Sequence, residues 1–375
     1  MNIHFNKPLL LPRSLDHIRE AFTLEHTSGN GPFTAKCHAF LKQRYGFSSC
    51  LLTQSCTAAL EMAALLADIA PGDEVIVPSF TFVSTANAFA LRNAHIRFVD
   101  STAWHPNMDC SLIEELITPR TKAVVCVHYA GMACDMQALQ DICRRHNLCL
   151  IEDAAQSIDT TYQGRALGTF GNLSAFSFHE SKNIICGEGG CLAINDPLLH
   201  ARADILWEKG TNRSAFLRGE VDKYSWVDVG SSFLPSEITA AFLYGQLESL
   251  ENIQARRVKN WNRYHAALSP LAEKGYLEVP RIPEGSSNNA HMYYVVCRSG
   301  DERTRLMAHL KSHGIQSVFH YQALHASSYY ASRHGDRKLP QAERYTECLL
   351  RLPLHYHLTD EEVDEVVERL HGFYA

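Results

Sequence analysis

The stretch KAVVCVHYAGMACDMQALQDICRRHNLCLIEDAAQS, residues 122–157, decides the fold. Two short apolar runs, 122–131 and 148–153, flank a helical pattern over 135–147. A strand, a helix and a second strand of these lengths form a βαβ unit, in which the two strands lie parallel. Both strands are apolar throughout rather than alternating, which is typical of strands that are covered on both faces.

The same alternation of apolar runs and helical stretches continues on both sides of this unit. Further strands are predicted at 73–79, 95–100, 173–180 and 189–196, and further helices at 57–70, 81–94 and 111–118. Pro71 and Gly72 end the first of these helices, because neither residue continues a helix well. The sequence therefore predicts an α/β fold with a mostly parallel central sheet.

The character of the chain changes near Ser236. Residues 236–268 have the pattern of one long helix, which would connect two parts of the protein. After a loop, a strand is predicted at 292–299 and helices at 303–314 and 359–374. We therefore predict a large domain over residues 1–250 and a smaller C-terminal α/β domain over residues 251–375.

The charge distribution disfavours nucleic-acid and membrane partners. The net charge is −6 with neutral histidines, and no run of basic residues stands out, whereas nucleic-acid and polybasic membrane contacts depend on clustered Lys and Arg. The N-terminal stretch contains only a short apolar run, unlike a signal peptide, and no apolar stretch reaches the length of a membrane span. We therefore expect a cytoplasmic protein.

The 12 cysteines and 20 histidines do not form a recognised metal or disulfide pattern. No C-x-x-C pair and no H-E-x-x-H motif occurs, and most cysteines lie in apolar runs such as AVVCVHYAG and NLCLIED. Free cysteine is a common small core residue, and a reducing compartment fits this use better than a disulfide framework. Histidine pairs such as His320 with His325 and His355 with His357 are more typical of exposed or hydrogen-bonded side chains than of ligands. We therefore expect no metal site.

Four stretches follow predicted strands, at the strand ends where open parallel sheets bind ligands. The first, LLTQSCTAALEMAA at 51–64, runs from a strand-like LLT into a helix that begins near Thr57. Free N–H groups at a helix N-terminus suit phosphate, so Thr57 and Ala58 would donate backbone N–H groups and the Thr57 hydroxyl would add a bond. Taken alone, an ordinary N-cap explains this stretch better.

Two further stretches supply a carboxylate and an aromatic ring. In IEDAAQS, residues 151–157, Asp153 ends a buried strand, where a carboxylate needs a cationic partner or several donors. Asp153 would either cap or pair within the protein, or face a protonated ring nitrogen of a ligand that Gln156 helps to orient. In PSFTFVSTANAF, residues 78–89, Phe80 or Phe82 would stack on a flat ligand, although core packing is the commoner fate of phenylalanine.

The fourth stretch is SFHESKNIICGEGG at 177–190, in which Ser177 and Lys182 flank a turn and glycines then allow close backbone approach. Alone, Lys182 would be a surface lysine. Together, the four stretches supply phosphate donors, a stacking ring, a carboxylate and an amine, which pyridoxal 5′-phosphate requires. The lysine would bind the cofactor aldehyde in a pocket that lowers its pKa, and the carboxylate would keep the pyridine nitrogen protonated. We therefore interpret Lys182 as the covalent anchor of this cofactor.

The order of the motifs resembles the DegT/DnrJ/EryC1/StrS family of sugar-nucleotide aminotransferases over nearly the whole chain. The motifs that carry the resemblance are TQSCTAALEMAA, PSFTFVSTANAF, FVD, VHYAG, EDAAQS, SFHESKN and GEGG. The resemblance implies the fold-type I architecture of aspartate aminotransferase, and a homodimer or higher homo-oligomer whose partner subunit completes each site. It also implies that Lys182 forms the Schiff base, Asp153 pairs with the pyridine nitrogen, Gln156 lies close to the ring, Phe82 stacks on it, and Thr57, Ala58 and Ser177 hold the phosphate.

One position departs from the family pattern. Many members use an asparagine from a G-x-N-x-R stretch to bind the phosphate in the neighbouring subunit. Here the stretch is DVGSSFLPSEITAA, residues 228–241, in which Ser232 takes the place of the asparagine and Leu234 that of the arginine. A serine hydroxyl still donates one hydrogen bond, so Ser232 stays a candidate cofactor contact.

Three other stretches resemble the family branch that makes dTDP-4-amino-4,6-dideoxy-D-galactose for surface polysaccharides such as lipopolysaccharide and enterobacterial common antigen. They are WEKGTNRSAFLRGEVDKYSWVDVGSSFLPSE, NAHMYY and VFHYQALH. This resemblance implies transfer of the amino group of L-glutamate to C4 of dTDP-4-dehydro-6-deoxy-D-glucose. Lys209, Asn212 and Arg213 would then meet nucleotide phosphates or the donor carboxylate, and His320 and His325 would reach the sugar. An ordinary surface or loop role is the alternative for each of these residues.

Several other functions compete with this one. Transfer at C3 of a dehydro sugar, or at C4 with gluco stereochemistry, requires only a different pose of the sugar. Family dehydratases carry histidine at the lysine position, so Lys182 disfavours dehydration. A non-catalytic regulator of this fold would not need Lys182, Asp153 and Ser177 together, and no G-x-G-x-x-G supports a dinucleotide-binding dehydrogenase.

Overall fold

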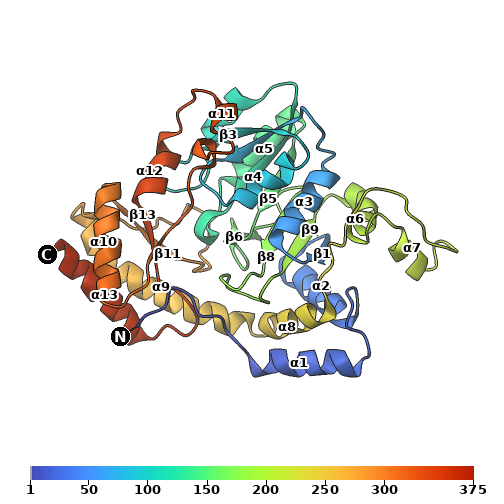
Figure 1. Ribbon diagram of the computed structural model, residues 1–375, viewed down its shortest axis with the longest axis horizontal. Coiled ribbons are helices and arrows are strands. Elements are labelled where there is room, and N and C mark those ends of the chain that lie inside the picture. The colour runs from blue at the N-terminus through green and yellow to red at the C-terminus, as the bar shows by residue number, and fades with distance from the viewer. Residues whose placement is uncertain (1) are drawn as a thin grey trace.

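The largest element of the protein is a seven-stranded sheet (Figure 1), seen in a computed structural model that describes residues 2–375. Its strand order is β1-β9-β8-β5-β4-β2-β3. The strands are β1 Ser49–Thr53, β2 Glu74–Pro78, β3 His95–Val99, β4 Thr121–Val127, β5 Cys149–Asp153, β8 Leu173–Ser177 and β9 Gly190–Ile194. From β3 to β8 all neighbours are parallel, whereas β9 is antiparallel to both β8 and β1. The prediction of a mostly parallel central sheet is therefore confirmed.

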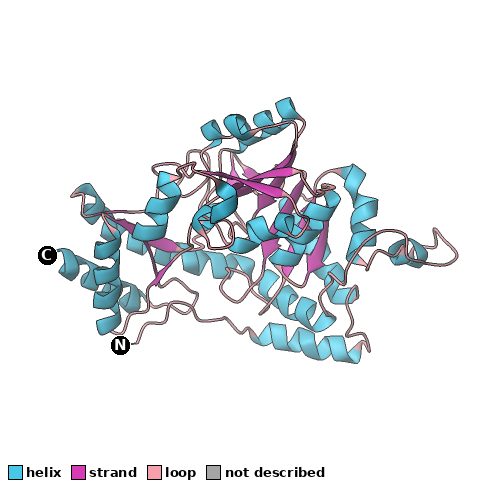
Figure 2. Cartoon of the chain, turned by 45° about the horizontal axis from the view of Figure 1, so that its top comes forward, coloured by secondary structure: helices cyan, strands magenta, loops and turns pink. Residues whose placement is uncertain are grey.

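Helices cover both faces of this sheet (Figure 2), which is why its strands are apolar throughout. Successive strand residues point to opposite faces. Val125 and Ile151 therefore pack with α3 Cys56–Leu66 and α4 Val83–Ala90, whereas Val124 and Leu150 pack with α5 Met136–His146 on the other side. The other elements of this part are α1 Pro12–Thr23, α2 Pro32–Tyr45, β6 Thr161–Tyr162, β7 Arg165–Ala166, α6 His200–Trp207, α7 Arg213–Leu217 and α8 Glu237–Leu247.

A second, four-stranded sheet follows in the C-terminal part of the chain. It has the order β10-β11-β13-β12, and all its pairs are antiparallel. Its strands are β10 Leu277–Glu278, β11 Tyr293–Cys297, β12 Val318–Phe319 and β13 Leu349–Leu352, and the helices around it are α10 Gly300–Ser312, α12 Pro340–Cys348 and α13 Asp360–Tyr374. The short helix α11 Ala331–His334 lies beside β3 of the large sheet instead (Figure 1), where His334 packs on Phe98. A separate apolar core joins this sheet to α10 and α13.

The helix α9, Leu250–Glu273, connects the two sheets (Figure 1). Leu250 and Ile253 at its start belong to the core under the large sheet, whereas Tyr264 and Leu268 near its end belong to the core of the small sheet. The sequence predicted one helix over 236–268. The structure has two helices there, because α8 ends at Leu247 and α9 begins at Leu250. The predicted domain boundary at residue 250 coincides with the first residue of α9, and the division into two domains stays a prediction.

The N-terminal segment, residues 3–6, lies against the small sheet rather than the large one. Ile3 bridges Ile315 in a parallel pair and is fully buried in the core of the small sheet. Asn6 donates a hydrogen bond to the carbonyl of Glu180, two residues before Lys182. The N-terminal segment therefore does not belong to the core of the domain that the sequence predicted for residues 1–250.

The prediction of an α-helix over residues 111–118 is also wrong. The structure has two short 3₁₀ turns there, Cys110–Leu112 and Glu114–Leu116. The side chain of Asp109 accepts hydrogen bonds from the backbone and hydroxyl of Ser111, which favours a turn, and a segment this short does not sustain an α-helix. Among the helices of residues 2–375, none is both long enough and apolar enough to cross a bilayer.

Candidate active site

A cavity of about 1130 Å³ opens between the large sheet, the small sheet and the N-terminal segment. The sequence-predicted residues that line it are Thr57, Phe82, Asp153, Gln156, Ser177, Lys182 and His320. Asp153 and Ser177 end β5 and β8, and Gln156 and Lys182 lie in the loops that follow these strands. Thr57 lies in the first turn of α3, Phe82 precedes α4, and His320 follows β12, Val318–Phe319. The topology therefore brings seven side chains, scattered over more than 260 positions of the sequence, to one site.

Lys182 lies in the turn between β8 and β9, and its backbone N–H closes this turn on the His179 carbonyl at 2.9 Å. The next residue, Asn183, is buried and fixes the turn to the rest of the protein. Its side-chain amide donates to Gln254 and to the Asn289 carbonyl, each at 2.8 Å. Burial lowers the pKa of the Lys182 ammonium, so a larger fraction of its amine is neutral and nucleophilic at neutral pH.

Asp153 ends β5 with its carboxylate in the cavity. One carboxylate oxygen accepts from the Thr85 hydroxyl at 2.7 Å and the other from the Ala155 N–H at 3.1 Å. Both donors are neutral, so the negative charge remains for a cationic group in the cavity. Burial raises the pKa of this carboxyl, and the bond from Thr85 opposes that effect. The arrangement fits a protonated ring nitrogen, which would restore the balance of charge.

The N-terminus of α3 forms another wall of the cavity. Ser55 is the N-cap, and its hydroxyl oxygen accepts the N–H of Ala58 at 3.1 Å. The N–H groups of Cys56 and Thr57 have no acceptor among residues 2–375, and the Thr57 hydroxyl lies 2.8 Å from that of Ser84. The structure thus favours Cys56 and Thr57 as phosphate donors, whereas Ala58, expected from the sequence to donate, is occupied by the cap.

Phe82 and Phe80 have different environments, which separates the two candidates for stacking. Phe80 is 1% exposed and packs among Tyr129, Tyr321 and Tyr345, so it is a core residue. Phe82 is 54% exposed at the cavity and is free to cover a planar ligand. Gln156, by contrast, is held in place, because it accepts from the Ala130 N–H at 2.7 Å and donates to the Tyr321 hydroxyl at 2.9 Å.

The glycine-rich turn before β9 brings backbone close to the phosphate-binding wall. A Cβ atom on Gly190 would lie 2.5 Å from the backbone N of Cys56 and 2.5 Å from the backbone C of Ser55. Atoms of different segments cannot approach so closely, so any larger residue at position 190 would displace the start of α3.

We expect Gly190→Ala to lower the free energy of unfolding by about 1–3 kcal/mol. The same displacement should weaken cofactor binding, because Cys56 and Thr57 lie at this end of α3. Urea denaturation measures the first effect and cofactor titration the second. Gly372→Ala is the control, since a Cβ there meets no atom within 4 Å; equal effects of the two variants would contradict the expectation.

Six predicted residues do not line this cavity, and Ala58 in the first turn of α3 is one of them. Lys209, Asn212, Arg213 and Ser232 lie in the 209–235 segment, outside its lining. Lys209 and Arg213 both pair with Glu208, and Ser232 is exposed. The His325 imidazole is buried between the Ser79 hydroxyl, at 2.7 Å, and the Glu343 carboxylate, at 3.3 Å. The expectation that His325 reaches a sugar in this cavity is therefore not met.

Sequence reasoning missed several residues that line the cavity, of which Arg351 in β13 is the most informative. Its Nη2 donates to the Phe319 carbonyl at 3.2 Å, while its Nε is buried and has no hydrogen-bond partner among residues 2–375. Burial lowers the pKa of this guanidinium. A lone arginine in the apolar run LLRLPL was a signal for a buried functional cation. His291 and Tyr321 also line the cavity and were missed.

Comparisons with known proteins agree with this geometry. The DegT/DnrJ/EryC1/StrS aminotransferase family matches residues 13–371. The aminotransferase TlmJ from Streptoalloteichus hindustanus is 30% identical with a TM-score of 0.91, covering 100% of this chain and 99% of its own. Spr1654 from Streptococcus pneumoniae, named as a candidate sugar aminotransferase and solved in its PLP-form, is 25% identical with a TM-score of 0.90, covering 100% and 98%. The aminotransferase from Psychrobacter cryohalolentis is 25% identical with a TM-score of 0.93, covering 99% of each chain.

Proposed function

The chain belongs to the DegT/DnrJ/EryC1/StrS aminotransferase family and uses pyridoxal 5′-phosphate, and from this premise we propose that it aminates a sugar nucleotide. The proposed reaction moves the amino group of L-glutamate to C4 of dTDP-4-dehydro-6-deoxy-D-glucose. The products would be dTDP-4-amino-4,6-dideoxy-D-galactose and 2-oxoglutarate. The observation that carries the proposal is the cavity in which Lys182, Asp153 and the start of α3 meet.

The residues of the cavity fit the cofactor at each of its ends. Lys182 would be its covalent anchor, the Asp153 carboxylate would face its ring nitrogen, and Phe82 would cover its ring. The N–H groups of Cys56 and Thr57 and the hydroxyl of Ser177 would hold its phosphate. When bound, the cofactor supplies an electron sink for carbanion chemistry at the substrate carbon.

Lys182 also has a role as general base and acid. Its amine, displaced by glutamate, would accept the proton from the glutamate Cα, and in the second half of the reaction it would deliver a proton to C4 of the sugar. Its lowered pKa suits both tasks, because burial makes the neutral amine easier to form than in a lysine exposed to water. The face from which Lys182 approaches C4 would decide whether the new amine is axial or equatorial.

Arg351 is proposed to bind a carboxylate of the amino donor. Its guanidinium lines the cavity, and its Nε is buried without a hydrogen-bond partner among residues 2–375. An arginine binds a carboxylate through two parallel hydrogen bonds. We expect Arg351→Ala to reduce kcat/KM for glutamate by about 30-fold, since a hydrogen bond to a charged group contributes about 2 kcal/mol.

Single-turnover kinetics, followed by the cofactor absorbance, measure this loss for each substrate separately. The loss should be larger with glutamate than with the sugar nucleotide, and Arg333→Ala, an exposed arginine outside the cavity, should change neither. A loss confined to the sugar nucleotide would assign Arg351 to a phosphate instead and contradict the expectation.

The 209–235 segment is proposed to complete the cavity of a second copy of the chain. It projects from the body of the protein beyond α6 (Figures 1 and 2). Several of its apolar residues are exposed, and Trp226 is 81% exposed. Exposed apolar clusters of this kind mark interaction surfaces. Ser232 and the basic residues Lys209 and Arg213 lie on the same segment, so docking would bring them toward the partner's cavity.

We expect Trp226→Ala to raise the dimer Kd by about 30-fold or more, because a buried tryptophan at an interface contributes about 2 kcal/mol or more. Light scattering over a dilution series measures the Kd. Leu198→Ala is a matched control, because Leu198 is 89% exposed and lies outside the segment. A wild-type monomer at all concentrations, or equal effects of both variants, would contradict the expected interface.

One incubation tests the proposed function. The protein is mixed with dTDP-4-dehydro-6-deoxy-D-glucose, L-glutamate and pyridoxal 5′-phosphate, and the sugar product is examined by NMR. An axial amine at C4, recognised by a small H3–H4 coupling, is the expected result. An equatorial amine would mean gluco stereochemistry, and no amination of this sugar, with turnover of a 3-dehydro sugar nucleotide, would move the reaction to C3.

A further inference from the structure

A cluster of ligand-type side chains lies on the face of the large sheet that is turned away from Lys182. Val127 and Asp153 line the cofactor cavity, so their neighbours Cys126 and Glu152 face the opposite side. His128 follows Cys126 by two residues, and Cys134 comes from the loop that leads into α5. None of these four side chains takes part in the proposed reaction.

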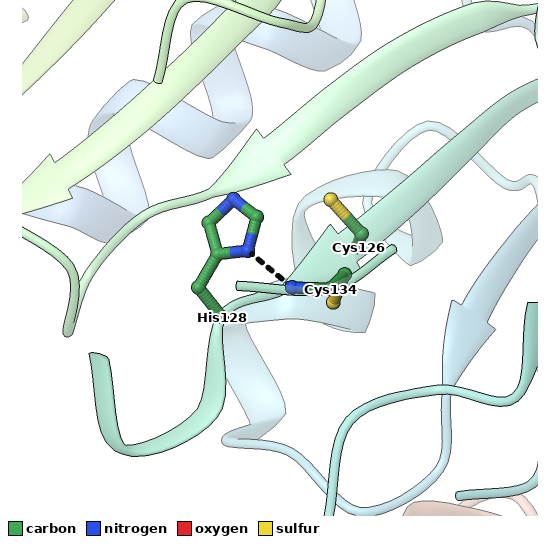
Figure 3. A group of neighbouring side chains, drawn as sticks. All are labelled: Cys126, His128 and Cys134. Atoms are coloured by element: carbon green, nitrogen blue, oxygen red, sulfur yellow. Dashed lines mark hydrogen bonds between the residues drawn. The ribbon is translucent and has the colours of Figure 1, made fainter. Parts of the chain in front are cut away.

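The three nitrogen- and sulfur-bearing side chains of this cluster lie close together. One ligand atom each of Cys126, His128 and Cys134 lies within 4.8 Å of the other two. Figure 3 shows the imidazole of His128 beside the two cysteines. All three residues are buried, with exposed fractions of 0% to 2%. The Cys134 thiol donates to the Val127 carbonyl at 3.1 Å, and an ion bound here would replace this bond.

Hydrogen bonds fix the tautomer of His128 in the form that a metal needs. Its Nε2 lies 2.9 Å from Glu152 Oε2 and donates to it. Its Nδ1 accepts the backbone N–H of Cys134 at 3.2 Å (Figure 3), so the lone pair of Nδ1 points toward the Cys134 loop. A carboxylate that holds the far nitrogen of an imidazole is the usual support of a metal-binding histidine.

Glu152 is itself held rigidly, as this supporting role requires. Its carboxylate accepts the N–H groups of Gly168, Phe170 and Gly171 at 2.7 to 2.8 Å and the hydroxyl of Ser174 at 3.1 Å. With these bonds and the one from His128, its charge is already compensated. The charge of an added divalent ion would therefore be balanced by the two thiols, which lose their protons on binding.

We propose that Cys126, Cys134 and Nδ1 of His128 bind one thiophilic divalent ion of the zinc class. Two thiolates and a neutral imidazole make a neutral site, which a buried location tolerates, and sulfur and imidazole are the ligands that zinc prefers. Binding would replace the hydrogen bond from the Cys134 N–H to Nδ1. The ion would tie the loop before α5 to the end of β4.

A second cavity supplies the fourth position and a path of entry. It has a volume of about 1070 Å³ and is lined by Cys134 and Asp135, with the half-buried Cys110 beside them. A water molecule from this cavity would complete a tetrahedral site with three protein ligands. Cys110 is outside the group of atoms that lie within 4.8 Å of one another, so we do not place it among the ligands.

Cobalt(II) titration of the reduced full-length protein, after treatment with a chelator, tests the site. One equivalent of Co²⁺ should produce the thiolate charge-transfer band in the near ultraviolet and the visible bands of tetrahedral cobalt, and Zn²⁺ should remove both. Cys126→Ser and Cys134→Ser should each lose the thiolate band or reduce its intensity by half. Cys143→Ser, a buried thiol of the same packing cluster outside the site, should retain it.

Glu152→Gln gives a second test, since loss of such a supporting carboxylate weakens metal affinity by about 10–100-fold. Each variant is first shown to be folded by circular dichroism. The zinc content of protein expressed with added zinc is also measured, because a buried site that exchanges its ion slowly would show no cobalt bands. Absence of both bound zinc and cobalt bands in the reduced wild-type protein, or unchanged bands in the Cys126→Ser, Cys134→Ser double variant, would overturn the proposal.

Discussion

Replacement of Lys182 by alanine is expected to lower the rate of transamination by at least about 10⁴-fold, because the variant loses its general base and acid as well as the covalent anchor. The fold should survive, since the turn around residue 182 is held by backbone bonds and by the side chain of Asn183 rather than by the lysine amine. Stopped assays of 2-oxoglutarate formation measure the rate, and the absorbance of the bound cofactor reports the anchor.

Lys122→Ala provides the matched control, because Lys122 is exposed at the start of β4. It should leave both turnover and the cofactor spectrum unchanged. Full activity of the Lys182→Ala variant would show that another group moves the proton. It would contradict the proposal that Lys182 is the general base and acid of the site.

Asp153→Asn is expected to reduce kcat by about 10²–10³-fold, comparable to the loss of one preorganised electrostatic contact in other active sites. Asparagine keeps the size of the side chain and can still accept a hydrogen bond from Thr85 or Ala155, but it removes the charge that faces the ring nitrogen. The variant should therefore bind the cofactor and turn over slowly. Steady-state kinetics and cofactor titration separate the two effects.

Asp301→Asn is the control for this loss of charge, because Asp301 is exposed on α10. A Thr85→Val variant should show a smaller loss in the same direction, since the bond from Thr85 lowers the Asp153 pKa against the effect of burial. Activity of that variant should consequently fall off at a higher pH on the acid side than activity of the wild type. Wild-type rates in Asp153→Asn would rule out a catalytic role for the carboxylate.

The main features of the fold and of the cofactor site could be predicted because they depend on local signals. The apolar runs of β4 and β5 around the helix α5 indicated parallel strands, and that prediction is confirmed. The aminotransferase family and its architecture are confirmed as well. Asp153 and Ser177 end strands of the large sheet and Lys182 follows one, so a rule about strand ends sufficed to predict that they lie together.

The features that were missed depend on contacts between distant segments. Arg351 has no neighbour in sequence that marks it as part of the cavity. It reaches the cavity only because the small sheet, to which β13 belongs, forms one of the walls. The occupied N–H of Ala58 depends on the rotamer of Ser55, and the position of His325 depends on Ser79 and Glu343. The spacing of Cys126, His128 and Cys134 matches no familiar ligand pattern, so the sequence did not suggest the metal site that we propose from the structure.

The N-terminal segment has a consequence for how the protein matures. Ile3 pairs with Ile315, and Phe5 and Asn6 form part of the cavity wall. During synthesis, therefore, residues 3–6 find their partner only after more than three hundred further residues have been made. The large sheet can form earlier, because its strands end at Ile194. The bonds from Asn183 to Gln254 and to the Asn289 carbonyl also tie the Lys182 turn to later parts of the chain. The turn and the wall beside it would therefore be completed only after the C-terminal part of the chain has folded.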